Sequence, residues 1–578
     1  MSELLAKSEP KRSLKEHTED CLLIFDKLKR SFPNVETIAK DNRFWVLLRL
    51  AVTCHDLGKA HHDFQKVLIG KPKDWDFQRH ELFSLPFVEA LDLEEDELFL
   101  VRLIVAGHHK SFDALRCKYV ERYENDESDE LIGDSIDRSF KTAFKYVDTE
   151  GAIEIAKELG VLFPNLIKPK QPLLLLKEFN RKKKELAQNF KLMLLFGAMK
   201  QCDHMGSAMI EELANLDLIR FNFLQKQRQE LINNNADFYT HQITASHIVG
   251  NAILTAPTGT GKTETAMLWL EKQIEERGLG CAFYILPFTA SINAMWRRLG
   301  DNETGLGKDG VGMLHGNLNA VLYQQFVEEL GNVEGVSERI KTLKKTFKTL
   351  QTPLKVVTPF QLLKHIFGLK GFEKGIFEWT GGYFIFDEIH AYDPSVLAQI
   401  IVLLEFAVNK CGVRVFIMTA TLPTFLKVLL KVTLTTNGNL PYDFEADDDL
   451  YEKLKRHRIK VLDGEIFDFY KDIKRDLENN KKVLVVCNTV LRAQQVFEEL
   501  GGKKKGVLLH GGFNGEDRAE KEKQLKDKKN LPKLLVGTQA IEVSLDIDYD
   551  VIYTEIAPFD ALLQRFGRVN RKAPHEIK

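Results

Sequence analysis

The chain has 578 residues, of which 44% are hydrophobic and 28% are charged, and this balance excludes a fibrous or disordered protein. Its length accommodates about three or four domains. The formal net charge is only −2, which excludes recognition of nucleic acid by a uniformly positive surface, so any such binding must use local grooves.

The cysteines and the apolar segments indicate a reducing, aqueous compartment. Seven cysteines are scattered along the chain without a CxxC pair, which excludes a disulfide framework and a thiolate zinc site. Residues 1–12 are polar and hold no apolar signal core, and the longest apolar stretch, 396–408, is interrupted by Gln399 and Glu405. We therefore expect a cytoplasmic protein without a membrane span.

Residues 1–225 are predicted to form an all-α domain. Apolar residues recur at three- and four-residue spacing, as in 47–52 and 98–105, and short β-branched runs are scarce. A His-Asp doublet of the metal-phosphohydrolase type lies in this region, together with further imidazole and carboxylate groups. The predicted metal ligands are His17, His55, Asp56, His80, His108, His109 and Asp203.

This ligand set suits a pair of divalent transition metal ions, such as Mn²⁺, Co²⁺, Ni²⁺ or Fe²⁺. Two such ions, about 3.5–4 Å apart, activate a water molecule and stabilise the leaving oxygen of a phosphate ester. Asp56 has two carboxylate oxygens and is the predicted bridge between the ions, and Lys59, one turn further on, is predicted to bind the scissile phosphate. We interpret His61, His62 and His204 as ordinary surface or core histidines.

From residue 252 onward, short apolar runs alternate with helical segments, a pattern typical of buried parallel strands in α/β layers. The predicted strands are 252–255, 281–286, 354–358, 383–386, 413–418, 482–487, 507–510, 534–537 and 551–554. Their spacing predicts two successive RecA-like α/β domains, residues 236–440 and 450–578. The polar, acidic stretch 435–449 is interpreted as the linker between them.

A phosphate-binding loop with the sequence APTGTGKT occupies residues 256–263, between a predicted strand and an amphipathic helix. Its two glycines let backbone N–H groups approach the phosphates, Lys262 neutralises their charge and Thr263 offers a hydroxyl to Mg²⁺. The predicted nucleotide-binding residues are Gln242, Gly259, Thr260, Gly261, Lys262, Thr263 and Asp387.

Three later motifs complete a predicted ATPase. Asp387 and Glu388 end a predicted strand, where they would hold Mg²⁺ through water and activate the attacking water. Thr419-Ala420-Thr421 follows another strand and would couple hydrolysis to domain movement. Arg568 and Arg571 are predicted to share one face of a helix and to reach the γ-phosphate as arginine fingers.

The series from the phosphate loop to Arg571 resembles superfamily 2 DExH helicases. A His, His-Asp, His, His-His, Asp series followed directly by such a motor is similar to the helicase–nuclease family of type I CRISPR systems, often called Cas-three. The segments that carry this resemblance are Arg79-His80-Glu81, Gly107-His108-His109, 202–207, 387–390 and 564–571.

The resemblance implies an antiviral enzyme with an HD-type metal-dependent nuclease domain and an ATP-dependent DNA helicase that uses Mg²⁺. It implies 3′-to-5′ movement along single-stranded DNA, endonuclease and exonuclease cutting of that strand, and recruitment by a guide-RNA surveillance complex of the Cascade type. Family members usually carry a further domain over the strand channel. The chain ends seven residues after Arg571, so we expect either a truncated second helicase domain or the lack of that accessory domain.

Three other hypotheses stay open. One is a DExH RNA-remodelling ATPase whose HD domain is inactive or regulatory. Another is an ATP-gated binding module that does not cut, although the complete set of metal ligands argues against it. The third is a metal-dependent nucleotide phosphohydrolase, which would not need the motor.

Overall fold

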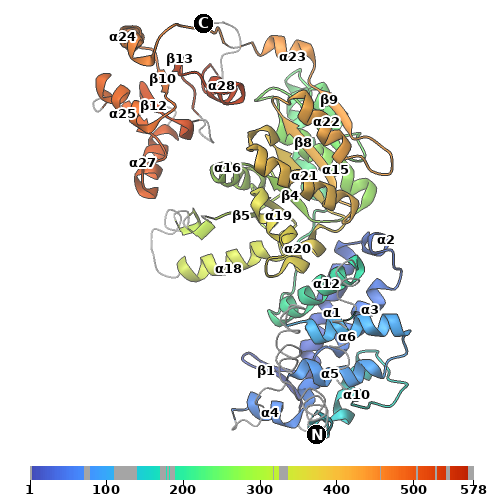
Figure 1. Ribbon diagram of the computed structural model, residues 1–578. Helices are drawn as coiled ribbons and strands as arrows, with labels where there is room; N and C mark the ends of the chain where they lie inside the picture. The colour runs from blue at the N-terminus through green and yellow to red at the C-terminus, as the bar shows by residue number, and fades with distance from the viewer. Residues whose placement is uncertain are drawn as a thin grey trace.

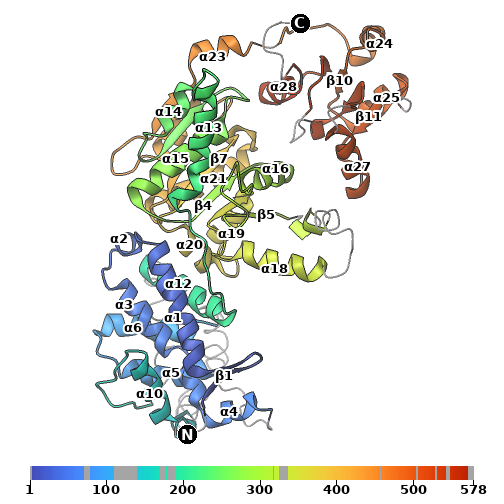
Figure 2. The same ribbon diagram turned by 180° about the vertical axis from the view of Figure 1, so that it is seen from behind.

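The computed structural model describes residues 3–70, 79–109, 140–169, 178, 181, 189–316, 318–319, 321–323, 336–455, 457–502, 506–526, 530–541 and 547–570. The chain forms three successive units, seen from two opposite sides in Figures 1 and 2. Within the described residues, no helix combines the length and the apolar character that crossing a bilayer would require.

The N-terminal unit is helical, as predicted, with one small antiparallel hairpin that the sequence analysis did not anticipate. The hairpin comprises β1 (Leu5–Ser8) and β2 (Lys11–Ser13). The helices are α1 (Leu14–Ser31), α2 (Val35–Ala39), α3 (Phe44–Cys54), α4 (His62–Leu68), α5 (His80–Glu89), α6 (Glu95–Gly107), α10 (Thr149–Glu158) and α12 (Phe190–Ser207), with a 3-10 turn at Leu57–Ala60.

Helix α1 begins where the sequence supplies a capping box. The Ser13 hydroxyl accepts from the backbone N–H of Glu16 at 3.2 Å, and the Glu16 carboxylate accepts from the backbone N–H of Ser13 at 2.9 Å. These bonds satisfy donors that a helix start leaves without intrahelical partners. They fix the register of α1, which later determines where its buried polar side chains point.

The first α/β unit holds a seven-stranded parallel sheet in the order β5-β6-β4-β7-β8-β3-β9. Its strands are β3 (Ala252–Thr255), β4 (Ala282–Ile285), β5 (Val311–Leu314), β6 (Leu354–Val357), β7 (Tyr383–Asp387), β8 (Arg414–Thr419) and β9 (Tyr442–Glu445). Helices cover both faces: α21 (Pro394–Asn409) and α22 (Thr424–Thr433) are in view in Figure 1, and α13 (Asn222–Asn233) and α14 (Thr240–Ala245) in Figure 2. The unit also contains α15 (Lys262–Arg277), α16 (Thr289–Leu299), α18 (Val336–Lys348), α19 (Pro359–Ile366) and α20 (Phe372–Trp379).

The linker predicted at 435–449 is wrong. Residues 442–445 form β9, which pairs in parallel with β3, and α23 (Asp448–Lys453) places Leu450 in the core of the same unit. The prediction failed because β9 is an edge strand, whose side chains are half or fully exposed, so it lacks the apolar run of a central strand. The first α/β unit therefore extends beyond residue 440 and includes α23.

The second α/β unit has a four-stranded parallel sheet in the order β11-β12-β10-β13. It comprises β10 (Val483–Val486), β11 (Gly506–Leu509), β12 (Leu534–Gly537) and β13 (Val551–Thr554), with α24 (Tyr470–Glu478), α25 (Val490–Glu499), α27 (Gly515–Lys526) and α28 (Phe559–Phe566). All nine predicted strands are thus present, with ends shifted by at most a residue or two.

One continuous hydrophobic core runs through the helical unit and the first α/β unit, whereas the second α/β unit has two separate clusters of its own. The continuity arises where α12 packs against α20 (Phe372–Trp379). A Cβ atom on Gly197 of α12 would lie 2.3 Å from the carbonyl oxygen of Glu373, so only glycine permits this approach. The Lys200 ammonium and the Glu373 carboxylate, 3.0 Å apart, pair across the same contact.

Candidate metal centre and nucleotide site

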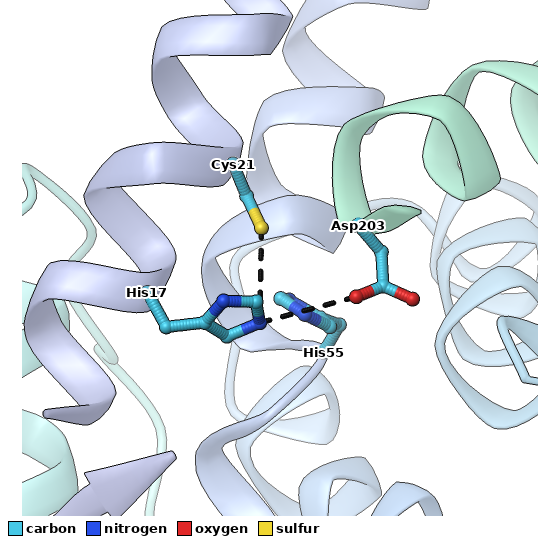
Figure 3. Close-up of side chains that lie close together, drawn as sticks. All are labelled: His17, Cys21, His55 and Asp203. Atoms are coloured by element: carbon cyan, nitrogen blue, oxygen red, sulfur yellow. Dashed lines mark hydrogen bonds and ion pairs between the residues drawn. The ribbon is translucent and has the colours of Figure 1, made fainter. Parts of the chain in front are cut away.

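The seven predicted metal ligands converge on one centre inside the helical unit. His17 lies on α1, His55 and Asp56 at the end of α3, His80 at the start of α5, His108 and His109 at the end of α6, and Asp203 on α12. Figure 3 shows that His17, His55 and Asp203 point toward one another from their separate elements.

Asp56 occupies the middle of the centre, and its two oxygens face different sets of histidines. Its Oδ2 atom lies 3.1 Å from Nε2 of His17 and 3.3 Å from Nε2 of His55. Its Oδ1 atom lies 3.1 Å from Nε2 of His80 and 3.7 Å from Nε2 of His108. This two-sided arrangement is what a carboxylate bridging two metal ions requires.

Backbone contacts fix the orientation of two of these rings. Nδ1 of His55 is 2.7 Å from the carbonyl oxygen of Val52, and Nδ1 of His108 is 2.6 Å from that of Val105. A carbonyl oxygen only accepts, so Nδ1–H donates in both rings and the neutral form keeps its lone pair on Nε2. Metal-ligating histidines are commonly held by such a bond from the other ring nitrogen.

The residues present fit a metal pair. Nε2 of His55 and Nε2 of His108 are buried and form no hydrogen bond within the described part of the chain, and the Asp56 oxygens that they face are buried as well. A nitrogen lone pair repels a carboxylate oxygen that faces it, and a metal ion between them would remove this repulsion. Burial disfavours a charged His108, but the carboxylates of Asp56 and Asp203 outweigh burial and raise its pKa.

Two neighbouring charges extend the centre. Burial opposes ionisation of Glu81, but His80, His108 and Arg79 lower its pKa to about 2, and its carboxylate lies 3.6 Å from Nδ1 of His80. The Lys59 ammonium lies 2.6 Å from Oδ2 of Asp56 and its side chain is largely buried. Lys59 therefore points into the centre, where the sequence analysis placed a phosphate contact.

The donor atoms form two groups, and one contains a residue that the sequence analysis missed. His17, Cys21, His55 and Asp203 form one group, and Asp56, His80, His108 and His109 form the other. Cys21 was grouped with the scattered cysteines, and a thiolate site was excluded because no CxxC pair exists. Its position one turn after His17 on α1 is the signal that could have identified it.

The histidines interpreted as ordinary residues lie outside both groups. Nε2 of His61 is 2.9 Å from the carbonyl oxygen of Ala143, and Nδ1 of His204 accepts from the Lys374 ammonium at 2.9 Å. His62 begins α4 on the surface. His204 lies at the contact between the helical unit and α20 rather than at the centre.

The predicted phosphate loop connects β3 to α15. Gly259 and Gly261 have φ angles of 87° and 74°, a left-handed backbone that favours glycine. The Lys262 ammonium lies 2.8 Å from Oε1 of Glu388, and the Thr260 hydroxyl donates to the carbonyl of Pro257 at 2.8 Å. The Thr263 hydroxyl accepts from the Arg298 guanidinium at 3.2 Å.

The carboxylates of the DExH motif lie at the end of β7, next to the phosphate loop. Burial, reinforced by Glu388, raises the pKa of Asp387, whose Oδ2 accepts from the Tyr284 hydroxyl at 3.0 Å. Glu388 has a φ of 53°, a strained left-handed conformation that clusters at functional sites. Its Oε2 lies 3.3 Å from the backbone nitrogen of Ala420, within the predicted coupling motif.

Gln242 contacts the phosphate loop directly. Its amide nitrogen donates to the carbonyl of Gly261 at 3.3 Å, and its amide oxygen accepts from the backbone N–H of Tyr239 at 2.9 Å. The side chain is buried on α14. It therefore lies beside the loop, where the sequence analysis expected a nucleotide-binding residue.

The predicted helix carrying Arg568 and Arg571 is wrong in its extent. Helix α28 ends at Phe566, and Val569 bridges to Tyr549 while Asn570 adopts a left-handed φ of 49°. Gly567 and this bridge end the helix before the first arginine. Arg568 thus lies beyond the helix, and Arg571 falls outside the described residues.

Arg565, which the sequence analysis did not single out, is buried at the start of this segment. Its guanidinium donates to the Thr554 hydroxyl at 2.8 Å and to the amide oxygen of Asn488 at 3.1 Å. It connects the ends of β13 and β10 and so holds the segment against the sheet. The sequence offered little sign of this role, because nothing in an arginine-rich motif distinguishes the one arginine that is buried from the others.

Comparisons with known proteins agree with this arrangement. A DEAD/DEAH box helicase model matches residues 239–429, and a model of the C-terminal part of the CRISPR-associated nuclease/helicase Cas3 matches residues 479–574. The CRISPR-associated nuclease/helicase Cas3 of Methanothermobacter thermautotrophicus is 26% identical over 577 residues. That alignment covers 91% of this chain and 66% of the relative, so the chain spans just under two thirds of its length.

Solved structures show the same fold. The crystal structure of T. fusca Cas3 with AMPPNP has a TM-score of 0.62 at 18% identity, covering 97% of this chain and 71% of that one. A chain of a CRISPR RNA-guided surveillance complex described as pre-nicking has a TM-score of 0.56 at 17% identity, covering 98% and 71%. Motifs, fold and relatives together confirm the predicted resemblance of this chain to the Cas3 family of CRISPR-associated nuclease/helicases.

Proposed function

We propose that the chain uses ATP hydrolysis to move 3′ to 5′ along single-stranded DNA and cuts that strand at the His-Asp centre. The observation that carries this proposal is the convergence of seven histidine and aspartate side chains on one buried centre, in a chain that also matches helicase models. The proposed domains are a nuclease at 1–225, a first helicase domain at 236–454 and a second helicase domain from 455 onward.

At the nuclease centre, bound divalent metal ions would supply an activated water and stabilise the leaving oxygen. His17, His55 and Asp203 would hold one ion, His80, His108 and His109 the other, and Asp56 would contribute one oxygen to each. The backbone bonds of His55 and His108 hold Nε2 toward the centre. Lys59 would attract the scissile phosphate to this pocket of carboxylates.

At the motor site, the chain's own residues bind and orient ATP. The backbone of Gly259, Thr260 and Gly261 would surround the phosphates, and Lys262 would exchange its pairing with Glu388 for the β and γ charges. Glu388, once released, would orient the attacking water. Arg568 and Arg571 remain the proposed arginine fingers from the second helicase domain.

The proposed partners follow from the relatives. A surveillance complex guided by RNA would deliver the chain to an opened DNA target, because one structural neighbour belongs to such a complex. Single-stranded DNA is the proposed substrate, and the proposed location is the cytoplasm. No feature of the described residues favours an RNA-remodelling ATPase instead.

The decisive experiment digests circular single-stranded DNA with purified protein stripped of metal and then supplied with single divalent ions. We expect cutting with Mn²⁺, Co²⁺ or Ni²⁺, with or without ATP, because histidine-rich sites favour these ions over Mg²⁺. Robust cutting in Mg²⁺ alone would contradict the proposed centre. A matched RNA circle separates this function from RNA remodelling, since preferential ATP turnover on RNA without DNA cutting would favour the latter.

A further inference from the structure

Cys21 lies within the metal centre, although it belongs to no recognised motif of the sequence. It follows His17 by one turn of α1, and its Sγ atom is 3.8 Å from Nε2 of His17. The side chain is fully buried, and Figure 3 shows the sulfur directed toward His17, beside His55 and Asp203.

The spacing of this group matches a metal coordination shell. The ligand atoms of His17, Cys21, His55 and Asp203 all lie within 4.8 Å of one another. Metal bonds of about 2.0–2.3 Å in a tetrahedral shell place neighbouring donors roughly 3.3–3.8 Å apart. Two distances in this group are close to these donor–donor distances. The sulfur of Cys21 lies 3.8 Å from Nε2 of His17, and the same nitrogen lies 3.9 Å from Oδ1 of Asp203.

A second observation points to a ligand at this position. Nε2 of His55 is completely buried, forms no hydrogen bond within the described residues, and is aimed into the group. The backbone bond to Val52 keeps the proton on the opposite nitrogen. His55 therefore presents a lone pair to the same point as the sulfur of Cys21.

The packing behind Cys21 holds the sulfur in this position. Helix α12 passes so close that a Cβ atom on Gly206 would lie 2.7 Å from Sγ of Cys21. Gly206 lies three residues after Asp203 on the same helix. The backbone that presents Asp203 thus also confines the thiol.

We propose that Cys21 is a further protein ligand, beside Asp56, of the metal ion held by His17, His55 and Asp203, an inference that rests on the proposed function. When the metal–sulfur bond forms, the thiol gives its proton to solvent, and no oxidant or reductant is needed. A thiolate is a soft donor. This half of the centre would therefore select Co²⁺, Ni²⁺, Fe²⁺ or Zn²⁺ over Mg²⁺, while the other half, with only nitrogen and oxygen donors, would be less selective.

The alternative role for Cys21 is that of a small buried packing residue, as is usual for free cysteines. Cys54 provides the matched control. It is also fully buried and directly precedes the ligand His55, but it belongs to neither donor group. An effect that any buried cysteine produces would therefore be seen equally when Cys21 or Cys54 is replaced.

The test is optical spectroscopy of full-length protein loaded with Co²⁺, comparing wild type with Cys21→Ala, Cys21→Ser and Cys54→Ala. Cobalt bound by protein gives weak visible bands, and a thiolate ligand adds a strong near-ultraviolet charge-transfer band. We expect both in wild type and in Cys54→Ala, and loss of the charge-transfer band alone in both Cys21 variants. DNA-stimulated ATP turnover serves as the check on folding.

The outcomes separate the two proposals. Visible bands without a charge-transfer band in wild type would overturn the role of Cys21 and leave the metal centre standing. A charge-transfer band that persists in Cys21→Ser or disappears in Cys54→Ala would also overturn it. Absence of any cobalt spectrum would overturn the metal centre itself, and with it the proposed nuclease. A wild-type spectrum with visible bands but no charge-transfer band overturns the role of Cys21 even if a variant fails to fold.

Discussion

The sequence indicates only part of what single side chains do in this molecule. The Lys262 ammonium, which the phosphate loop supplies for ATP, lies 2.8 Å from Glu388. Under the proposed function, nucleotide would replace this ion pair, and Glu388 would become available only when a phosphate has taken the lysine. The strained φ of Glu388 is consistent with a residue held for function rather than for stability.

Replacement of Lys262 by alanine should block duplex unwinding and long-range degradation while sparing the nicking of a target that is already single-stranded. Under the proposed function the lysine serves only ATP, whereas the proposed metal ligands lie in the helical unit. Helicase and nicking assays on the same preparation measure the two effects. If nicking of single-stranded circles were lost together with unwinding, the independence of the two sites would be refuted.

Arg568→Ala should leave ATP binding intact but slow turnover by about 10³–10⁵, the range for lost arginine fingers. A nucleotide-binding titration and a turnover assay, made side by side, check this. The contrast is Arg565→Ala, which removes buried bonds to Thr554 and Asn488 and should lower the melting temperature of the second α/β unit. Near-normal turnover in Arg568→Ala would remove that residue from the finger role.

At the scale of elements, the contact between α12 and α20 joins the metal centre to the ATPase sheet. Asp203 and Gly197 both lie on α12, and Gly197 meets the backbone of α20 where no larger residue fits. Three residues after α20, the chain enters β7, which ends at Asp387. Helix α20 is thus connected to both sites, to Asp203 through its contact with α12 and to Asp387 through β7.

Gly197→Ala should destabilise the protein by about 1–3 kcal/mol, as overpacked contacts do, and should weaken metal binding because α12 has to move. Thermal unfolding and a cobalt titration measure these changes. Gly515→Ala is the control, since that helical glycine has open space where a Cβ would stand. Equal effects of the two substitutions would show that the close approach at α20 has no special role.

The sequence predicted the central strands of both sheets but missed β5 and β9, the two edge strands of the seven-stranded sheet, for physical reasons. The strands at 252–255 and 534–537 are buried on both faces of their sheets, so their sequences are continuous apolar segments. The edge strand β9 and the end of α28 depend on pairing with residues far away in the sequence, and the local sequence pattern does not indicate such pairing. The histidines and aspartates were predicted by residue type and order, but Cys21 required the geometry of α1 against α12.

At the scale of the whole molecule, the candidate metal centre and the candidate nucleotide site occupy different units and consist of different residues. Asp56→Ala should abolish cutting and leave DNA-stimulated ATP hydrolysis largely intact, because the ion pairs of Asp56 among the described residues are all with side chains of the helical unit. Paired cutting and ATPase assays on folded protein measure both. Asp63→Ala, a carboxylate on neighbouring α4 outside both donor groups, is the control. Loss of both activities in a folded Asp56 variant would contradict the separation.

The continuous core has a mechanical consequence. It joins the candidate metal centre to the first α/β unit, while the second α/β unit has hydrophobic clusters of its own. Under the proposed function, the nuclease centre is therefore attached to the first helicase domain and does not move with the second. Each ATP-driven movement of the second helicase domain would draw the DNA strand past a nuclease centre that stays in place. The spacing of cuts would then depend on the path of the strand between the helicase domains and the nuclease centre.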